Sequence, residues 1–166
     1  GNLYNSMVNF QSQQIYNKVH LVPFGEYIPF ISSLRGLISF FDMPMSDVFK
    51  GKLNQSPMVF DMQSQNKMAP LICFDIAFGN TVRKSNISSL FMVNISNDTW
   101  FGKSIGPYQH FAHGIFRSIE SGKYTIRAAN NGISAIINPL GIIDEKIKVG
   151  ETGYIDFIES KTTKLT

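Results

Sequence analysis

Residues 69–78 read Ala-Pro-Leu-Ile-Cys-Phe-Asp-Ile-Ala-Phe, and they contain the single cysteine of the chain, Cys73. A short apolar run bounded by polar residues is typical of a buried strand, so we expect residues 67–74 to form a strand that ends at Cys73. In open α/β folds, ligands collect outside the carboxyl ends of strands, and Cys73 is expected at such an end. A lone thiol forms no intramolecular disulfide, so it is either a small buried hydrophobic side chain or a reactive group.

The rest of the chain predicts more strands than helices. Residues 105–121 carry apolar side chains at helical spacing and are followed by Gly122, a common helix C-cap. Asn130-Asn131-Gly132 stands between two apolar runs and predicts a β-hairpin, because Asn-Gly tolerates positive φ. Residues 30–41 suggest a short helix or an apolar loop. The expected strands are residues 3–10, 15–18, 57–62, 67–74, 90–95, 124–128, 133–137 and 153–157, which together indicate an α/β fold with layered packing.

Composition excludes some classes of partner. Fifteen basic and twelve acidic side chains leave a net charge of +3 without a run of basic residues, so we expect no nucleic-acid partner. A weak attraction to anionic lipid head groups stays open. No apolar stretch approaches the roughly 20 residues that span a bilayer, and the chain opens without a signal peptide or an initiator Met. We therefore expect it to be a piece of a longer protein.

Residues 18–27 read Lys-Val-His-Leu-Val-Pro-Phe-Gly-Glu-Tyr, so one lysine and one carboxylate stand in an otherwise apolar stretch. A thiolate nucleophile needs a nearby cation to lower its pKa and a carboxylate to manage protons. Lys18 and Glu26 are therefore candidate partners of Cys73, although a lysine at a strand end is more often a surface residue. His110 and His113 lie three apart on the expected helix, but no third ligand is nearby, so we interpret them as structural and expect no metal or cofactor.

Three segments, in the right order, resemble the signatures of the carbon-nitrogen hydrolase (nitrilase) superfamily in its apolipoprotein N-acyltransferase branch. Val-Pro-Phe-Gly-Glu at 22–26 and Asn-Asp-Thr-Trp-Phe-Gly at 97–102 favour this branch over amidases and nitrilases. The resemblance implies a nitrilase-like αββα sandwich for residues 1–159, lacking its N-terminal part, followed by a polar tail over residues 160–166. The segments are residues 16–29, residues 71–78, and residues 94–102 continued by residues 106–111, Arg127 and residues 130–134.

Carried over to this chain, the resemblance makes Cys73 the nucleophile and Lys18 the cation that stabilises the tetrahedral oxyanion, while Glu26 holds Lys18 and its loop. It implies transfer of a fatty acyl chain from phospholipid, through a Cys73 thioester, to the N-terminal diacylglyceryl-cysteine of a lipoprotein. Such enzymes are multi-pass proteins of the bacterial inner membrane, with this domain on the periplasmic side. The resemblance therefore implies the membrane as a partner.

The chain departs from the family pattern at two places. It has no Trp-Pro-Glu type motif upstream of Lys18 to carry the general base, so we expect the chain alone to be inactive. Asp75 stands where the acyltransferases usually have a glutamate, and we regard it as a candidate supporting carboxylate.

Two alternatives stay open. One is a soluble amidase of the same superfamily, and the other is a non-catalytic or inactive fragment.

The candidate substrate contacts are apolar or aromatic side chains near these motifs. Residues 28–45 form an apolar flap that suits a lipid substrate better than a small polar amide, and it should be the most lipid-sensitive part of the domain. An aromatic pair after the strand at 90–95 is a further candidate lining of an acyl-chain entrance. The residues that we predict to bind substrate are Phe30, Leu34, Phe74, Trp100 and Phe101.

Overall fold

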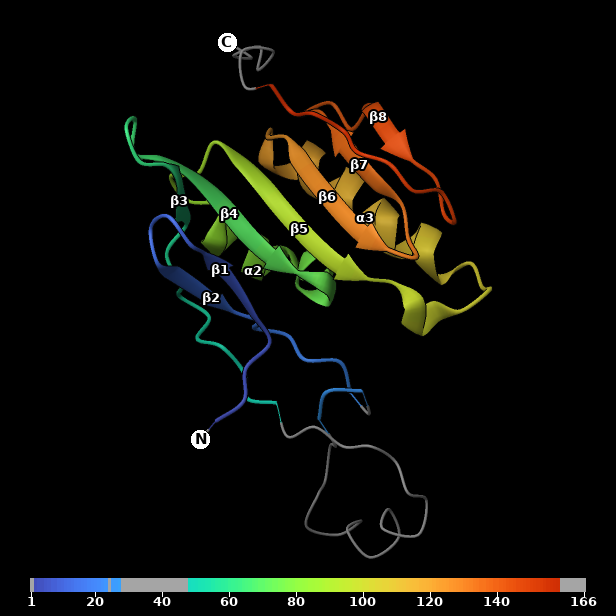
Figure 1. Cartoon of the computed structure of the whole chain (residues 1–166), viewed down its shortest axis with the longest axis horizontal. Coiled ribbons are helices and arrows are strands. Elements are labelled where there is room, and N and C mark those ends of the chain that lie inside the picture. The colour runs from blue at the N-terminus through green and yellow to red at the C-terminus, as the bar shows by residue number, and fades with distance from the viewer. Residues whose placement is uncertain (1, 24, 28–47, 159–166) are drawn as a thin grey trace, which may run out of the picture.

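The computed structural model describes residues 2–23, 25–27 and 48–158. Within these residues, the strands form an antiparallel pair, β1–β2, and a six-stranded sheet in the order β3-β4-β5-β6-β7-β8 (Figure 1). In the larger sheet, β4, β5 and β6 are parallel and the remaining neighbours are antiparallel. The strands are β1 (Ser6–Asn9), β2 (Gln14–Asn17), β3 (Met58–Asp61), β4 (Asn66–Ile72), β5 (Phe91–Asn97), β6 (Thr125–Asn130), β7 (Ser134–Ile137) and β8 (Ile143–Ile147).

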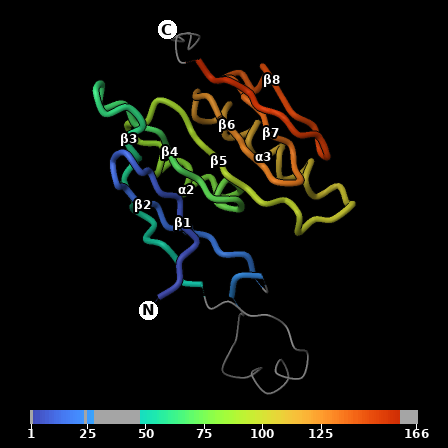
Figure 2. Tube along the Cα trace, in the orientation of Figure 1, coloured from blue at the N-terminus to red at the C-terminus, as the bar shows by residue number. Residues whose placement is uncertain are grey.

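Helices α2 (Gly79–Ser85) and α3 (Gly106–Ser121) connect the three parallel strands. Parallel neighbours need such crossover connections, and both helices lie on the same face of the sheet (Figures 1 and 2). The predicted helix is confirmed, and Gly122 ends it in a left-handed conformation at φ 62°, with its N–H bonded to the carbonyls of Ser118 and Ile119. The opposite face of the sheet is therefore covered by neither α2 nor α3 (Figures 1 and 2).

The apolar run before Cys73 arises because β4 is an interior strand of the six-stranded sheet. The last four residues of this strand are buried, because α2 and η2 (Cys73–Ala77) pack on one face and other apolar groups cover the opposite one. Ala69 and Leu71 join the core beneath α2, whereas Ile72 packs with Tyr16 and Val19 near the β1–β2 pair. A strand that is buried on both faces shows a continuous apolar run instead of alternation.

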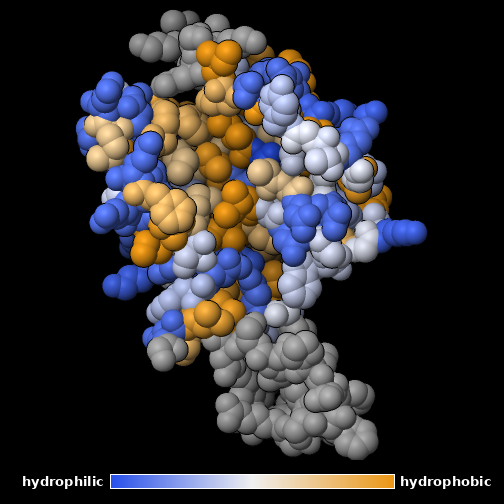
Figure 3. Space-filling model, in the orientation of Figure 1, coloured by the Kyte–Doolittle hydropathy of each residue, from blue (hydrophilic) through white to orange (hydrophobic). Residues whose placement is uncertain are grey.

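The far face of the sheet is also apolar. Figure 3 shows hydrophobic side chains gathered along the middle of this face, which α2 and α3 do not cover. Met68, Val93 and Ile126 contribute to it, and Ile155 and Phe157 pack against the same cluster. No helix in the described part of the chain is long and apolar enough to cross a membrane.

Most predicted elements are confirmed, but at the C-terminal end one predicted strand is wrong and one strand was not predicted. The hairpin at 130–132 joins β6 to β7 as expected, with Asn131 at φ 51°. Residues 153–157, however, form no strand, and β8 at Ile143–Ile147 was not expected. Alternation at 153–157 reflects one-sided burial of Ile155 and Phe157 against the sheet, and such burial does not require backbone pairing. The predicted helix or loop at 30–41 and the polar tail from 160 lie outside the described residues.

Candidate active site

Cys73 lies at the carboxyl end of β4, in the sharp turn from the strand into η2. Its backbone φ is 48°, in the left-handed region that a residue with a Cβ seldom adopts. Residues held in such conformations cluster at functional sites, where the surrounding structure enforces them. The thiol side chain is partly exposed, so this turn presents sulfur at the edge of the sheet.

A cavity of about 320 Å³ opens beside Cys73. It is formed where the loops that follow β2 meet the carboxyl ends of β4 and β5. The structure therefore brings Cys73 together with Lys18, Glu26 and Trp100, which are far apart in the sequence. The described residues that line the cavity are Asn5, Lys18, Val22, Glu26, Ile72, Cys73, Ile95, Ser96, Asn97 and Trp100.

Lys18 is paired with Glu26 inside this cavity. The lysine is only 1% exposed, and its Nζ donates to Glu26 Oε2 at 2.6 Å. The same oxygen accepts the Val22 N–H at 2.8 Å, and Oε1 accepts the Asn5 amide at 2.9 Å. Burial by itself would raise the pKa of Glu26, but these hydrogen bonds and the lysine charge outweigh it and hold the pKa below the ordinary value. Glu26 thus fixes both the ammonium group and the loop that carries it.

Asp75 lies beneath the cavity and is fully buried. Its carboxylate accepts the Tyr16 hydroxyl at 3.1 Å and the backbone N–H groups of Val19, His20 and Ile72 at 3.2, 2.7 and 3.2 Å. Burial raises the pKa of Asp75 despite these bonds, and burial followed by the Asp75 charge raises the pKa of Tyr16. Asp75 therefore ties the end of β4 to the segment directly after Lys18, which fits a supporting carboxylate better than a proton carrier.

The predicted substrate contacts fall into three groups. Trp100 is 68% exposed and lines the cavity mouth, so it is placed to meet a substrate. Phe74 and Phe101 are not among the described lining residues. Phe74 packs edge-on against Phe78, and the Phe101 ring packs in a tilted arrangement against the His110 ring. Both rings therefore stabilise the turns around the cavity instead of forming its wall. Phe30, Leu34 and the rest of the flap at 28–45 lie outside the described residues.

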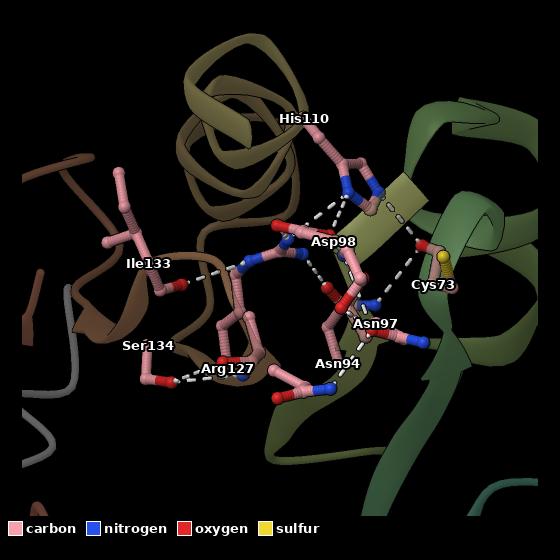
Figure 4. Close-up of polar contacts among 12 residues, drawn as sticks. Cys73, Asn94, Asn97, Asp98, His110, Arg127, Ile133 and Ser134 are labelled. Atoms are coloured by element: carbon pink, nitrogen blue, oxygen red, sulfur yellow. Dashed lines mark hydrogen bonds and ion pairs between the residues drawn. The ribbon is translucent and has the colours of Figure 1, made fainter. Parts of the chain in front are cut away.

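A buried polar cluster stands behind Cys73, on the side of the sheet that α3 covers (Figure 4). Asp98 Oδ1 lies 2.8 Å from His110 Nδ1, and Asp98 Oδ2 accepts Arg127 Nη2 at 2.7 Å. Arg127 also donates through Nη1 to the Asn94 side-chain oxygen, and through Nε to the Ile133 carbonyl at 3.2 Å. The five groups form one connected network between β5, β6 and α3.

This network touches the nucleophile position through its backbone. His110 Nε2 lies 3.2 Å from the Cys73 carbonyl oxygen, and the Asn94 amide donates to the same oxygen at 3.4 Å. Our interpretation of His110 as a structural helix residue missed this contact. The sequence signal for it was the polar pair Asn97-Asp98 directly after an apolar strand, together with a charged residue, Arg127, within the next predicted strand. Gly132 belongs to the same arrangement, since a Cβ there would clash with the Asp98 carboxylate.

The carbon-nitrogen hydrolase family matches residues 1–155. The chain belongs to this family. It is 42% identical over 153 residues to an apolipoprotein N-acyltransferase of Pseudomonas syringae pv. tomato, covering 92% of this chain and 30% of that protein. It is 40% identical over 151 residues to the apolipoprotein N-acyltransferase of Nitrosomonas europaea, covering 90% of this chain and 30% of that protein. The chain thus spans about 30% of the length of these relatives.

Solved structures confirm the expected nitrilase-like α/β fold. The amidase from Nesterenkonia sp. AN1, with an acetamide moiety added at its active-site cysteine, superposes with a TM-score of 0.55 at 18% identity over 82% of this chain and 46% of that one. Saccharomyces cerevisiae Nit3, a nitrilase-superfamily member, gives 0.56 at 17% identity over 90% and 55%. In the described residues, α2 and α3 form a helix layer on the six-stranded sheet, and the β1–β2 pair packs against β3 and β4, so these elements make up part of the αββα sandwich implied by the resemblance.

Proposed function

We propose that this chain is the catalytic domain of an apolipoprotein N-acyltransferase, on the periplasmic side of a bacterial inner membrane. The observation that carries the proposal is the meeting of Cys73 with the buried Lys18 ammonium in one cavity. The relatives that are about 42% identical over most of this chain bear that enzyme name. The cavity also has apolar walls, formed by Val22, Ile72, Ile95 and Trp100, which suit an acyl chain.

In the first half-reaction, the Cys73 thiolate attacks the ester carbonyl of a phospholipid. A C–S bond forms, the carbonyl oxygen gains negative charge, and the Lys18 ammonium stabilises this oxyanion. Collapse of the intermediate breaks the ester C–O bond and releases a lysophospholipid, whose alkoxide takes up the proton first removed from the thiol. Cys73 is left as an acyl thioester.

In the second half-reaction, the α-amino group of a diacylglyceryl-cysteine attacks the thioester. A C–N bond forms, the C–S bond breaks, and the amine proton returns to the departing thiolate. The product is an N-acylated lipoprotein, and the free thiol is restored. The two half-reactions, as written, require no metal or cofactor.

The general base for both steps is proposed to come from outside the described residues. Both carboxylate oxygens of Glu26 are already bound, to Lys18 and Val22 on one side and to Asn5 on the other. Asp75 is bound to four donors beneath the cavity and does not line it. Neither group is therefore placed to take the thiol proton.

A product assay separates this proposal from the soluble-amidase alternative. The intact protein is incubated with acyl-labelled phospholipid and a diacylglyceryl-cysteine peptide, and in parallel with small aliphatic amides. We expect label on the peptide amine, with no ammonia from the amides. Ammonia release without peptide acylation would establish the amidase instead.

The 166-residue chain is assayed beside the intact protein, and comparable transfer by the chain alone would place the base among residues 1–166.

A further inference from the structure

The buried cluster behind Cys73 supports an inference that rests on the proposed role of Cys73 as nucleophile. We propose that His110 is a positioning residue, present as an imidazolium, whose two ring N–H groups hold the Asp98 carboxylate and the Cys73 carbonyl. In Figure 4, the carbonyl oxygen of Cys73 points toward His110 and Asn94, while the sulfur points away from the cluster. His110 would therefore act on the nucleophile through its backbone.

The protonation state of His110 is inferred from the geometry at its two ring nitrogens. Nδ1 lies 2.8 Å from Asp98 Oδ1, and Nε2 lies 3.2 Å from the Cys73 carbonyl oxygen. A carbonyl oxygen and an ionised carboxylate only accept hydrogen bonds, whereas a neutral imidazole carries a single N–H. Either neutral tautomer would leave a ring lone pair facing an acceptor oxygen. The imidazolium satisfies both contacts.

Asp98 is held in its ionised form by its other partners. Oδ1 also accepts the Ser96 hydroxyl at 2.7 Å, and Oδ2 accepts Arg127 Nη2 at 2.7 Å. Burial by itself would raise the pKa of Asp98, but the His110 hydrogen bond and the Arg127 charge outweigh it and lower the pKa. Arg127 Nη2 also lies 3.2 Å from His110 Nδ1. If Nδ1 were unprotonated and accepted a hydrogen bond from Arg127, its lone pair would also face the acceptor oxygen Asp98 Oδ1 at 2.8 Å.

The cluster leaves an excess of positive charge close to Cys73. The charged groups around the His110 ring are Asp98 after β5 and Arg127 on β6, with His113 further along α3. One carboxylate then stands against two cations, Arg127 and His110. Burial lowers the pKa of Arg127, while the charge of Asp98 acts in the opposite direction, as would a thiolate at Cys73. A positive cluster favours the thiolate form of a cysteine.

The carbonyl contact also accounts for the strained backbone of Cys73. The residue has φ 48°, and its carbonyl oxygen faces two side-chain donors, one from His110 and one from Asn94. Arg127 in turn fixes Asn94 by donating to its side-chain oxygen. The two donors hold this carbonyl on the side of the cluster, while the sulfur points away from the cluster (Figure 4) and Cys73 lines the cavity together with Lys18.

Three variants of the intact protein separate the two parts of this role. His110→Gln can place an amide N–H near the former Nε2 and so keep the bond to the Cys73 carbonyl, but it carries no charge. His110→Asn is shorter and can reach only Asp98. His113→Gln is the matched control, since it removes a half-buried histidine one turn further along the same helix. Each variant is assayed for acyl transfer and for Cys73 alkylation by iodoacetamide between pH 5 and 9.

We expect the alkylation profiles of both His110 variants to move upward by about one pH unit, which slows alkylation at pH 7 roughly tenfold. The His113→Gln profile should stay at that of the parent. His110→Gln should retain more acyl transfer than His110→Asn, because it still holds the Cys73 carbonyl. Unchanged alkylation profiles in both His110 variants, or more transfer by His110→Asn, would overturn the proposal. Alkylation needs no phospholipid, so it reports on His110 even where acyl transfer fails.

A spectroscopic measurement on the parent protein covers the case in which the His110 variants do not fold. Nitrogen-15 NMR of the histidine side chains distinguishes an imidazolium, with two protonated ring nitrogens, from a neutral ring with one. We expect two protonated nitrogens on His110 at pH 7. The His113→Gln spectrum assists the assignment by removing the neighbouring ring. A neutral His110 ring at pH 7 would contradict the proposal.

Discussion

Lys18 Nζ lies 2.6 Å from Glu26 Oε2, and both groups line the cavity that Cys73 enters. A buried ammonium is stable only with a partner, and Glu26 provides it while also binding the backbone N–H of Val22. The lysine is thus held at a fixed place before any substrate arrives. Preorganised charge of this kind stabilises a developing oxyanion without rearrangement during the reaction.

Replacing Lys18 by Met should therefore abolish most of the turnover. Loss of an oxyanion-stabilising donor typically costs about 100- to 1,000-fold in rate. The variant should also lose stability, because Glu26 is left without its cation. The double variant Lys18→Met/Glu26→Gln should regain stability but not activity. Steady-state kinetics and urea unfolding check the two effects, and wild-type turnover by Lys18→Met would exclude an oxyanion role.

The Lys18–Glu26 pair also predicts a pH dependence of stability. The pKa of Glu26 is lowered in the folded protein, so ionised Glu26 contributes stability above its unfolded pKa of about 4.3. That contribution is lost as the pH falls through the lowered folded-state value. Urea unfolding should show a gap between the parent and Glu26→Gln that is constant above about pH 5.5 and narrows below about pH 4. A gap that widened toward low pH would contradict the direction of this shift.

Asp75 should matter for stability more than for chemistry. Asp75→Asn replaces one acceptor oxygen by an NH₂ group that faces N–H donors, so we expect a loss of about 1–3 kcal/mol in the free energy of unfolding. Asp61→Asn is the control, since Asp61 is an exposed carboxylate that bonds only its own turn. Chemical denaturation measures both variants. A stable Asp75→Asn protein without activity would instead place Asp75 in the chemistry.

Local sequence patterns located much of this site. The apolar run at 69–72 predicted a buried strand with Cys73 at its end, and the polar pair Lys18 and Glu26 stood out from apolar neighbours. Each of these signals lies within about ten residues of chain. The contact of His110 with Cys73 joins positions 37 residues apart, and it forms only because α3 crosses back over the sheet and packs against both η2 and β6. No local pattern encodes that crossing, so a helical histidine was interpreted as structural.

Local patterns also failed at residues 153–157, where the predicted strand does not form. Alternating apolar residues report that one face of a segment is buried, and Ile155 and Phe157 are indeed packed against the sheet. Whether the backbone also pairs depends on where the segment crosses the sheet. β8 was missed for the opposite reason, because residues 143–147 form a mostly polar strand beside β7.

Trp100 offers a direct test of whether the cavity mouth meets lipid. It is the one tryptophan of the 166-residue chain, and 68% of it is exposed. Its fluorescence in the purified chain should shift to the blue when phospholipid vesicles are added, because the indole leaves water. Brominated lipids should quench it. An unchanged spectrum in the presence of vesicles would place lipid entry elsewhere in the site.

The proposed reaction depends most on Cys73 as the residue that receives the acyl chain. The intact protein is incubated with phospholipid in the absence of an acceptor, digested, and examined by mass spectrometry beside Cys73→Ser and Cys73→Ala. We predict one acyl group on the peptide that contains Cys73, which hydroxylamine removes as expected of a thioester, and no transfer by Cys73→Ala. Acyl transfer that persists in Cys73→Ala, or an adduct on any other residue, would contradict the account.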